Sequence, residues 1–346
     1  MRAGGRVALV VLAAVAQACT GPAYLLRASW SEARLLLRRQ PITSLLARPD
    51  LDPGLRERLE LTLAVRDFAA GPLGLRVGRS YSTFAEVDDD ATVWVVSAAY
   101  RDRLEPYAWR YPLVGRLPYR GFFARREADA LAARLATQQL DVDIRPALAF
   151  STLGWFADPL LSNVAGEPPV SVATTVLHEL FHATLYVPGQ AAFNESAATF
   201  AGQRGAIAFF CGGPGAHPER CADAGRRWAA TRARGRLLGR LAARLRTLYA
   251  ATPAPALRER ARQRLVSAAA ASLERRGLGV RADLLPPNNA RLLGELLYVT
   301  ELEKLDALAP SDADLGPGLA RMVAAARDAP EPFEAVRALA TSAPGR

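Results

Sequence analysis

The most constraining feature of this sequence is the pentapeptide HELFH at residues 178–182, which is followed by Glu195. An α-helix advances 3.6 residues per turn, so His178 and His182 lie on one face and can present two imidazoles to one metal ion. Glu179 follows the first histidine directly, which places its carboxylate beside such a metal, where it can act as a general base. A catalytic zinc ion takes three protein ligands, and two histidines with a glutamate form an established set. Glu195 is the candidate third ligand.

The same stretch predicts a pair of antiparallel helices. Apolar residues recur at helical spacing over Val172–Tyr186, and a Pro-Gly pair then ends the helix. A second helix is predicted from about Ala192, with Asn194 or a nearby polar group available for its first turn. His182 near the end of the first helix and Glu195 near the start of the second can therefore meet across the hairpin.

A bare HExxH pattern also occurs in helices that bind no metal, so the alternative is a structural hairpin whose polar residues are hydrogen-bonded. Three observations favour the metal site. The chain has three histidines and two are in this motif, the motif lies on a predicted helix with an apolar back, and a glutamate follows on a second helix. No third histidine and glycine follow the motif directly, which argues against the metzincin pattern and favours a glutamate ligand.

Several segments of the chain resemble a bacterial family of predicted zinc aminopeptidases. The similar segments are residues 115–123, 149–160, 177–183, 186–189, 192–199 and 288–292, together with Tyr298. The resemblance implies a secreted or membrane-anchored metallopeptidase in which His178, His182 and Glu195 hold zinc and Glu179 is the base. The resemblance also implies that the substrates are peptides with a free amino terminus. The alternative is a catalytically degenerate envelope lipoprotein that acts as a scaffold or binding protein.

Two positions depart from the pattern of that family. Gln190 stands where an aspartate is usual, and Gly202 stands where a glutamate is usual. Carboxylates near a metal can orient its ligands or bind a substrate amine, so both departures bear on metal affinity and on exopeptidase specificity.

The oxyanion formed during peptide hydrolysis needs a hydrogen-bond donor besides the metal. The candidate donors are Tyr119, Arg120, Tyr186, Arg291 and Tyr298. Tyr298 is preferred because the family resemblance includes it, together with the pair Asn288-Asn289. The structural alternatives are a core tyrosine with a satisfied hydroxyl and an asparagine pair that simply begins a helix.

The N-terminus has the pattern of a secretory signal peptide over residues 1–18. Basic residues precede the apolar run Val7–Val15, which is too short to span a bilayer permanently, and Ala16-Gln17-Ala18 precedes Cys19. A cysteine at this place favours a lipoprotein that is cut before Cys19, acylated on its thiol and anchored in the bacterial envelope, facing the periplasm. Because Ala16 stands where lipoprotein signals usually have leucine, a soluble periplasmic form is the alternative.

The two remaining cysteines flank a short Gly- and Pro-rich loop. In an exported protein, a local disulfide between Cys211 and Cys221 is expected. Two unpaired thiols remain an alternative, because pairing is not visible in a sequence. A metal site formed by Cys211, His217 and Cys221 is less favoured, since an oxidising compartment promotes the disulfide and no fourth ligand is apparent.

The net charge of +10 raises the question of a nucleic-acid partner. Lys304 is the only lysine, and the arginines accompany many alanines, which indicates a compositional bias. No nucleic-acid-binding motif accompanies them. The arginines of residues 226–276 recur at helical spacing and are expected on solvated faces, with contact to an anionic membrane surface as the alternative. The expected partners are therefore a peptide substrate and, through Cys19, a membrane, but no nucleic acid.

The remaining sequence predicts a mostly α fold with a small β-sheet, in the α+β class, arranged as a zincin-like metallopeptidase. Besides the hairpin, the predicted helices are Ala23–Arg39, Pro53–Phe68, Arg125–Ala136, Glu219–Ala250, Ala256–Arg276 and Ala290–Leu308. The predicted strands are Thr92–Ala98, Leu140–Ser151 and, more weakly, Leu117–Phe123. Residues 19–346 are expected to form one domain, divisible into a sheet-containing part (about 19–165) and a helical catalytic part (about 166–346).

Overall fold

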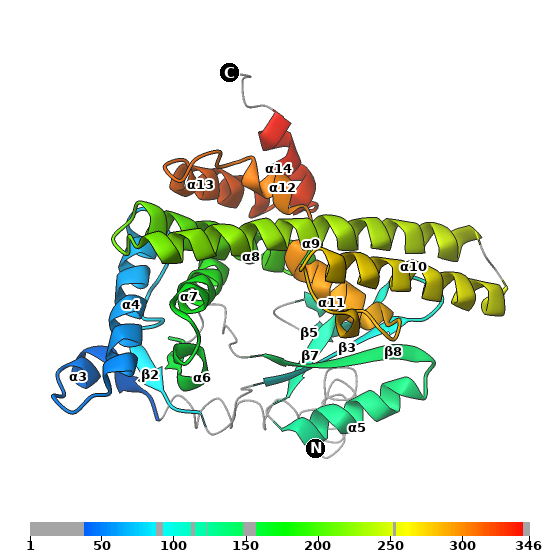
Figure 1. Cartoon of the computed structure of the whole chain (residues 1–346), viewed down its shortest axis with the longest axis horizontal. Helices are drawn as coiled ribbons and strands as arrows, with labels where there is room; N and C mark the ends of the chain where they lie inside the picture. The colour runs from blue at the N-terminus through cyan, green and yellow to red at the C-terminus, as the bar shows by residue number, and fades with distance from the viewer. Residues whose placement is uncertain are drawn as a thin grey trace, which may run out of the picture.

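The computed structural model describes residues 38–87, 93–111, 115–122, 124–147, 157–251 and 254–341. The predicted signal peptide, the proposed lipidation site Cys19 and most of the predicted helix Ala23–Arg39 lie outside these residues. Helices dominate the described residues and strands are short, in agreement with the predicted α+β class (Figure 1). None of the described helices combines the length and the apolar character needed to cross a lipid bilayer.

The secondary structure begins with short elements and continues mainly as helices. The helices are α3 (Ile42–Leu46), α4 (Pro53–Ala70), α5 (Arg125–Ala136), α6 (Ser162–Ala165), α7 (Pro169–Thr184), α8 (Ala191–Cys211), α9 (Pro218–Ala251), α10 (Pro255–Arg275), α11 (Asn289–Val299), α12 (Leu302–Asp306), α13 (Leu315–Ala326) and α14 (Pro332–Thr341). The strands are β1 (Gln40–Pro41), β2 (Thr83–Ala85), β3 (Val93–Tyr100), β4 (Pro106–Tyr107), β5 (Trp109–Tyr111), β6 (Gly115–Leu117), β7 (Tyr119–Phe122), β8 (Leu140–Ala147) and β9 (Leu160–Leu161).

The main sheet is built around β3. Strand β8 pairs antiparallel with the whole of β3 on one side, and β7 and β4 pair antiparallel with it on the other. Helix α5 packs on one face, where Val96 and Leu131 share a small core, and α11 contacts β3 and β8 (Figure 1). Two smaller sheets comprise β1, β2 and β9, with β2 parallel to β9, and the pair β5 and β6.

Helix α8 lies at the centre of the helical part of the molecule. It packs against α7, α9 and α11, and its phenylalanines are almost completely buried. A helix that is apolar around most of its circumference is stable only when other elements surround it. The first turn of α8, which contains Glu195, is therefore held by the main core.

Helices α11 and α12 replace the single helix predicted over Ala290–Leu308, so that prediction is wrong in its length. Helix α11 ends at Val299, Thr300 is extended and Glu301 has a left-handed backbone with φ of 53°. The backbone N–H of Thr300 donates to Oγ of Ser196 at 3.0 Å, which takes it out of the helical hydrogen-bond pattern. A long-range contact with α8 therefore ends the helix where the local pattern continues.

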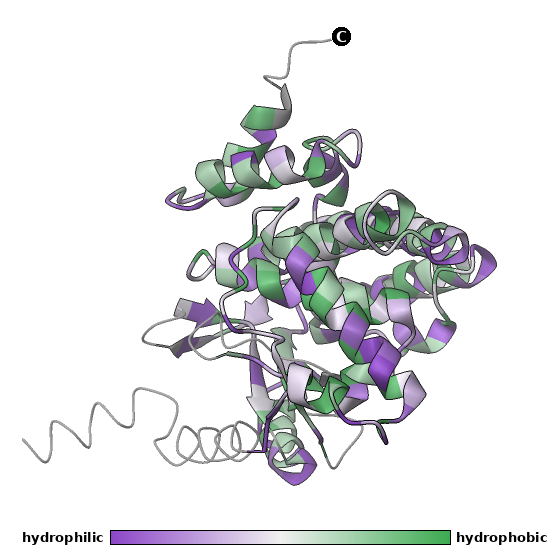
Figure 2. Ribbon diagram, turned by 90° about the vertical axis from the view of Figure 1, so that its left-hand side faces the viewer, coloured by the Kyte–Doolittle hydropathy of each residue, from purple (hydrophilic) through white to green (hydrophobic). Residues whose placement is uncertain are grey.

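Hydrophilic and hydrophobic residues are interspersed along the helices of the molecule (Figure 2), and the long helices α9 and α10 contain many arginines. Arg240 and Arg244 are exposed on α9, as expected for a solvated face. Arg262 on α10 is not, since it is 4% exposed and ion-paired with Asp141 on β8. For this arginine the prediction of a solvated position is wrong, because helical spacing alone does not show which partner a buried charge meets.

A disulfide joins the last residue of α8 to the first turn of α9. The sulfur atoms of Cys211 and Cys221 are 2.00 Å apart, and the backbone N–H of His217 in the intervening loop donates to the carbonyl of Phe210 at 2.9 Å. The neighbouring helices are thus joined covalently at the end of α8 that is remote from Glu195.

Candidate metal centre

Helices α7 and α8 form the hairpin that the motif predicts, and Asn194 holds its turn. The buried Asn194 side chain accepts a hydrogen bond from the N–H of Val187 at 2.9 Å and donates to the carbonyl of the same residue at 2.8 Å. These bonds connect the first turn of α8 to the segment that leaves α7. Asn194 therefore positions its neighbour Glu195 opposite the end of α7.

Gly202 allows α7 and α8 to approach closely behind the first histidine. A Cβ atom at this position would lie 2.7 Å from the carbonyl oxygen of Thr174 and 3.2 Å from Cβ of His178. Both distances are shorter than ordinary van der Waals contacts. Glycine is thus required by helix packing here, and a glutamate could not occupy this position in the present arrangement of the helices.

We expect the substitution Gly202→Ala to destabilise the protein by about 1–3 kcal/mol, the usual range for overpacking. The matched control is Gly225→Ala on α9, where a Cβ would meet no atom within 4 Å. Alanine there is expected to be neutral or stabilising, because it favours the helix over glycine. Urea unfolding of both variants measures the difference. An unfolding midpoint of Gly202→Ala equal to that of the wild type would contradict the close helix contact.

Three ligand atoms converge where the hairpin closes. Nε2 of His178 and Nε2 of His182 are 3.2 Å apart, and Oε2 of Glu195 lies 3.3 Å from the first and 3.6 Å from the second. The side chains are 15%, 7% and 12% exposed, respectively. Within the described residues, this is a group of histidine and acidic side chains close enough to share one metal ion.

The distances fit a tetrahedral zinc ion. Zinc bonds to histidine nitrogen and carboxylate oxygen are about 2.0–2.2 Å long, so two ligand atoms of a tetrahedron are separated by about 3.3–3.6 Å. The three observed separations are 3.2, 3.3 and 3.6 Å. Nitrogen and carboxylate oxygen are also donors that zinc accepts, and three protein ligands leave a fourth position open. The residues present therefore fit this metal.

The Glu195 carboxylate and the two histidines alter one another's pKa values. Burial alone would raise the pKa of the Glu195 carboxyl, but His182 and His178 outweigh it and hold this pKa far below its usual value. Burial alone would lower the pKa of the His182 imidazole, but the Glu195 carboxylate raises it above its usual value. The cluster thus keeps Glu195 ionised, which is the form that a metal ligand needs.

Glu179 lies on α7 between the two histidines but outside the three-residue cluster. It is partly buried, and its charge is near enough to raise the pKa of Tyr81, after the larger effect of burial. It also contributes to the raised pKa of His182 and of Tyr298. Glu179 therefore acts electrostatically on the site from beside the ligands, at the position predicted for the base.

Tyr298 and Tyr119 are two of the predicted donors that the structure brings to the site. The Tyr298 ring, which is 38% exposed, stacks on His178 with ring centroids 6.2 Å apart, and the nearby Glu195 charge raises the pKa of its hydroxyl. The Tyr119 hydroxyl donates to Oε1 of Glu195 at 3.4 Å, and burial, then Glu195, raises its pKa well above the usual value. Both hydroxyls therefore stay protonated at neutral pH and remain able to donate.

Tyr186 lies near the same cluster, whereas Arg291 forms structural contacts elsewhere. Burial, followed by the Glu195 charge, raises the pKa of Tyr186 to about 12. Nε of Arg291 donates to Asp143 on β8 at 3.0 Å, and its Nη1 donates to the carbonyl of Ala282. Arg291 is therefore a structural link between α11 and the sheet.

The asparagine pair at the start of α11 has a structural role, which is the alternative expected from the sequence. Asn288 caps the helix by accepting from the N–H of Arg291 at 3.0 Å and donates to the carbonyl of Val142. The buried Asn289 side chain donates to the carbonyl of Tyr100 at 2.8 Å and accepts from the Tyr249 hydroxyl. The pair fixes α11 on the main sheet and thereby places Tyr298.

Tyr81 is a residue near the site that sequence reasoning missed. It is 3% exposed and has a left-handed backbone with φ of 58°. Burial, followed by the charges of Glu179 and Asp158, raises the pKa of its hydroxyl. Its N–H donates to the carbonyl of Asp158 at 2.7 Å. No motif surrounds Tyr81 in the sequence, so only the folded chain shows its proximity to Glu179.

Comparison with known protein families places the chain in a family. A protein-family model described as "Putative aminopeptidase" matches residues 23–339. No curated protein and no solved structure matches the chain. The family match spans both helices of the hairpin, the sheet and α11, and therefore every residue of the candidate centre. The chain belongs to this "Putative aminopeptidase" family.

Proposed function

We propose that the protein is a zinc-dependent aminopeptidase of the bacterial cell envelope, with a zincin-like catalytic hairpin. The observation that carries this proposal is the convergence of His178, His182 and Glu195 at the separations of a tetrahedral zinc site. Membership of an aminopeptidase family supports the peptidase role. Glu179, one residue from a ligand on α7, supplies the general base.

The residues around the cluster have separate tasks in peptide hydrolysis. Zinc, when bound, supplies a Lewis acid that lowers the pKa of water and polarises a carbonyl group. Glu179 accepts the proton from the attacking water and later returns it to the leaving amine. Tyr298, kept protonated, is the candidate donor to the oxyanion, because the single proton of Tyr119 is already donated to Glu195. Tyr119 orients Glu195 through this hydrogen bond.

We further propose that the protein is exported and anchored by a lipid on Cys19. The support is the sequence pattern alone, in which a short apolar segment precedes a cysteine. The disulfide between Cys211 and Cys221 is in keeping with an oxidising compartment. The soluble periplasmic form, cleaved by the ordinary signal peptidase, is distinguished from the lipoprotein by the mass of the mature N-terminal peptide.

Metal analysis combined with a peptide panel tests the proposal. Purified protein is expected to contain about one zinc per chain, to lose it to a chelator and to recover activity when zinc is restored. Peptides with a free amino terminus are expected to be cleaved, and the same peptides with an acetylated amino terminus are expected to resist. His182→Ala should lose the stoichiometric metal. Metal-loaded protein that cleaves neither set would instead support the scaffold alternative.

A further inference from the structure

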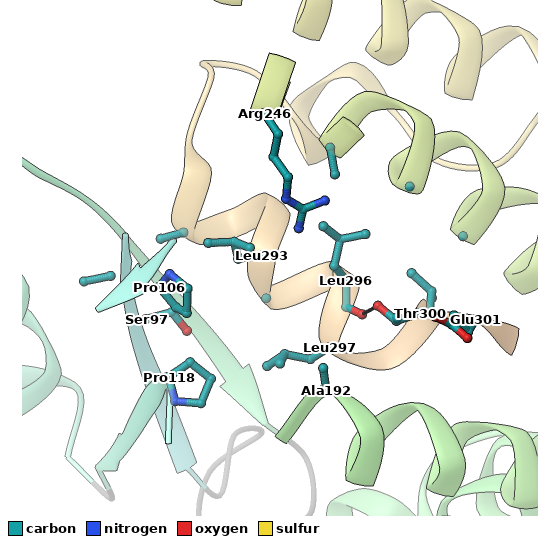
Figure 3. Close-up of a pocket in the computed structure, with 17 residues that line it drawn as sticks. Ser97, Pro106, Pro118, Ala192, Arg246, Leu293, Leu296, Leu297, Thr300 and Glu301 are labelled. Atoms are coloured by element: carbon teal, nitrogen blue, oxygen red, sulfur yellow. Dashed lines mark hydrogen bonds between the residues drawn. The ribbon is translucent and has the colours of Figure 1, made fainter. Parts of the chain in front are cut away.

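A cavity of about 430 Å³ lies between α9, α11 and the main sheet (Figure 3). Its volume is in the range of small-molecule sites in proteins. The lining is mainly apolar and includes Pro106, Leu293, Leu296 and Leu297. Such a lining favours an apolar ligand group, because each square ångström of apolar surface removed from water is stabilising.

Small residues on one face of α9 line this space. Gly235, Gly239 and Ala242 line the cavity and follow one another at the spacing of helical turns. A Cβ atom on Gly239 would meet no atom within 4 Å, so its position borders open space. Because Gly239 lines the cavity, a larger side chain at this exposed position would extend into the space beside it without displacing neighbouring atoms.

The cavity adjoins the metal centre through α8 and α11. Ala192 lines it and precedes Glu195 by three residues on the same face of α8. Leu297 lines it and immediately precedes Tyr298, whose ring stacks on His178. Two helices therefore contribute residues both to the cavity wall and to the metal centre.

The main sheet provides a third connection. Ser97 on β3 lines the cavity and pairs directly with Tyr119 on β7. Directly opposed residues in antiparallel strands project to the same face of a sheet, with Cβ atoms about 4.5–5.5 Å apart. The Tyr119 hydroxyl reaches Glu195. The cavity and the metal centre therefore have walls from the same three elements, α8, α11 and the main sheet, although none of the three ligand residues lines the cavity itself.

Arg246 gives the cavity its unbalanced charge. It extends from α9 toward Leu293 and Leu296 (Figure 3), it is exposed, and no carboxylate within the described ranges pairs with it. The acidic lining residue Glu301 is ion-paired with Arg337 at 2.5 Å. A cation at the rim repels a basic group and tolerates an apolar one.

We infer that this cavity binds the side chain of the N-terminal residue of the substrate, and that it selects bulky apolar residues over basic ones. The inference rests on the proposed aminopeptidase function and adds the substrate class to it. The open face at Gly239 sets the size limit. Arg246 disfavours lysine and arginine.

The test uses Gly239→Leu with Gly225→Leu as its matched control. Both glycines are on α9, neither position has an atom within 4 Å of an added Cβ, and Gly225 does not line the cavity. Leucine favours a helix over glycine, so both variants should fold, which circular dichroism checks. We expect Gly239→Leu to lower kcat/KM for peptides with N-terminal phenylalanine about 10–100-fold relative to N-terminal alanine. Gly225→Leu should leave this ratio unchanged.

A second variant tests the charge. Arg246→Ala is expected to raise kcat/KM for N-terminal lysine peptides, relative to leucine peptides, by about 3–10-fold, as loss of one exposed repulsive charge allows. Wild-type protein that cleaves no peptide would refute the proposed function itself. Wild-type protein that cleaves peptides, with the same phenylalanine-to-alanine ratio in Gly239→Leu, would refute only the assignment of the cavity.

Discussion

Glu179→Gln is expected to reduce kcat for peptide cleavage about 10²–10⁴-fold, the usual contribution of a general base. Glutamine has nearly the shape of glutamate but cannot accept a proton at neutral pH. The three residues that fit the metal, His178, His182 and Glu195, are left intact, so zinc content should stay close to that of the wild type. Steady-state kinetics on a free-amine peptide, with zinc measured on the same sample, gives both quantities.

The control is Glu60→Gln, which makes the same chemical change at an exposed position of α4. This variant should keep wild-type activity and metal content. A Glu179→Gln protein that retains stoichiometric zinc and more than a tenth of wild-type kcat would exclude Glu179 as the base. Loss of zinc together with activity would show that Glu179 acts on the ligands and not on water.

Arg262→Ala is expected to lower the free energy of unfolding by about 3–5 kcal/mol, because it removes one partner of a buried ion pair. The Arg262 side chain is 4% exposed and Asp141 is 9% exposed, and a hydrogen bond joins them. Nη2 of Arg262 also donates to the carbonyl of Pro287 at 3.0 Å. In the variant, Asp141 would still accept a hydrogen bond from the N–H of Asn289 and would still form an ion pair with the half-exposed Arg101. These two contacts do not replace the buried guanidinium of Arg262.

Arg264→Ala is the control for this prediction. Arg264 is exposed on the same helix, so its loss removes the same charge and should change stability by less than about 0.5 kcal/mol. The double variant Asp141→Asn with Arg262→Leu should recover part of the loss, since it leaves no unpaired charge. Urea unfolding curves of all three compare them. If Arg262→Ala unfolds within 1 kcal/mol of Arg264→Ala, the ion pair contributes little to the fold.

Local patterns in the sequence predict the core of the candidate site. Helical periodicity places His178 and His182 on one face, and the breaker before Ala191 turns the chain so that Glu195 faces them. The same reasoning gives the bounds of α5, Arg125–Ala136, and places β3 and β8. Each of these depends on residues close together in the chain, where spacing and geometry are directly linked.

Contacts between distant residues were not predictable in this way. Tyr119 was one of five candidate donors, and only the pairing of β7 with β3 shows that it reaches Glu195. The break at Thr300 depends on Ser196 in another helix. The burial of Arg262 depends on Asp141 in a strand. None of these partners leaves a periodic signal, because the residues meet only after the chain has folded.

The three proposed metal ligands all belong to one hairpin, whereas the tyrosines beside them come from the sheet and from α11. Contacts between near neighbours in the chain form with a small loss of chain entropy, and distant ones form with a larger loss. Metal capture thus depends on a local unit, and completion of the catalytic surroundings depends on assembly of the whole domain. If the proposed zinc site is correct, a mutation in the sheet can abolish turnover in a family member that still binds its metal, and metal content alone is then a poor guide to which members are active enzymes.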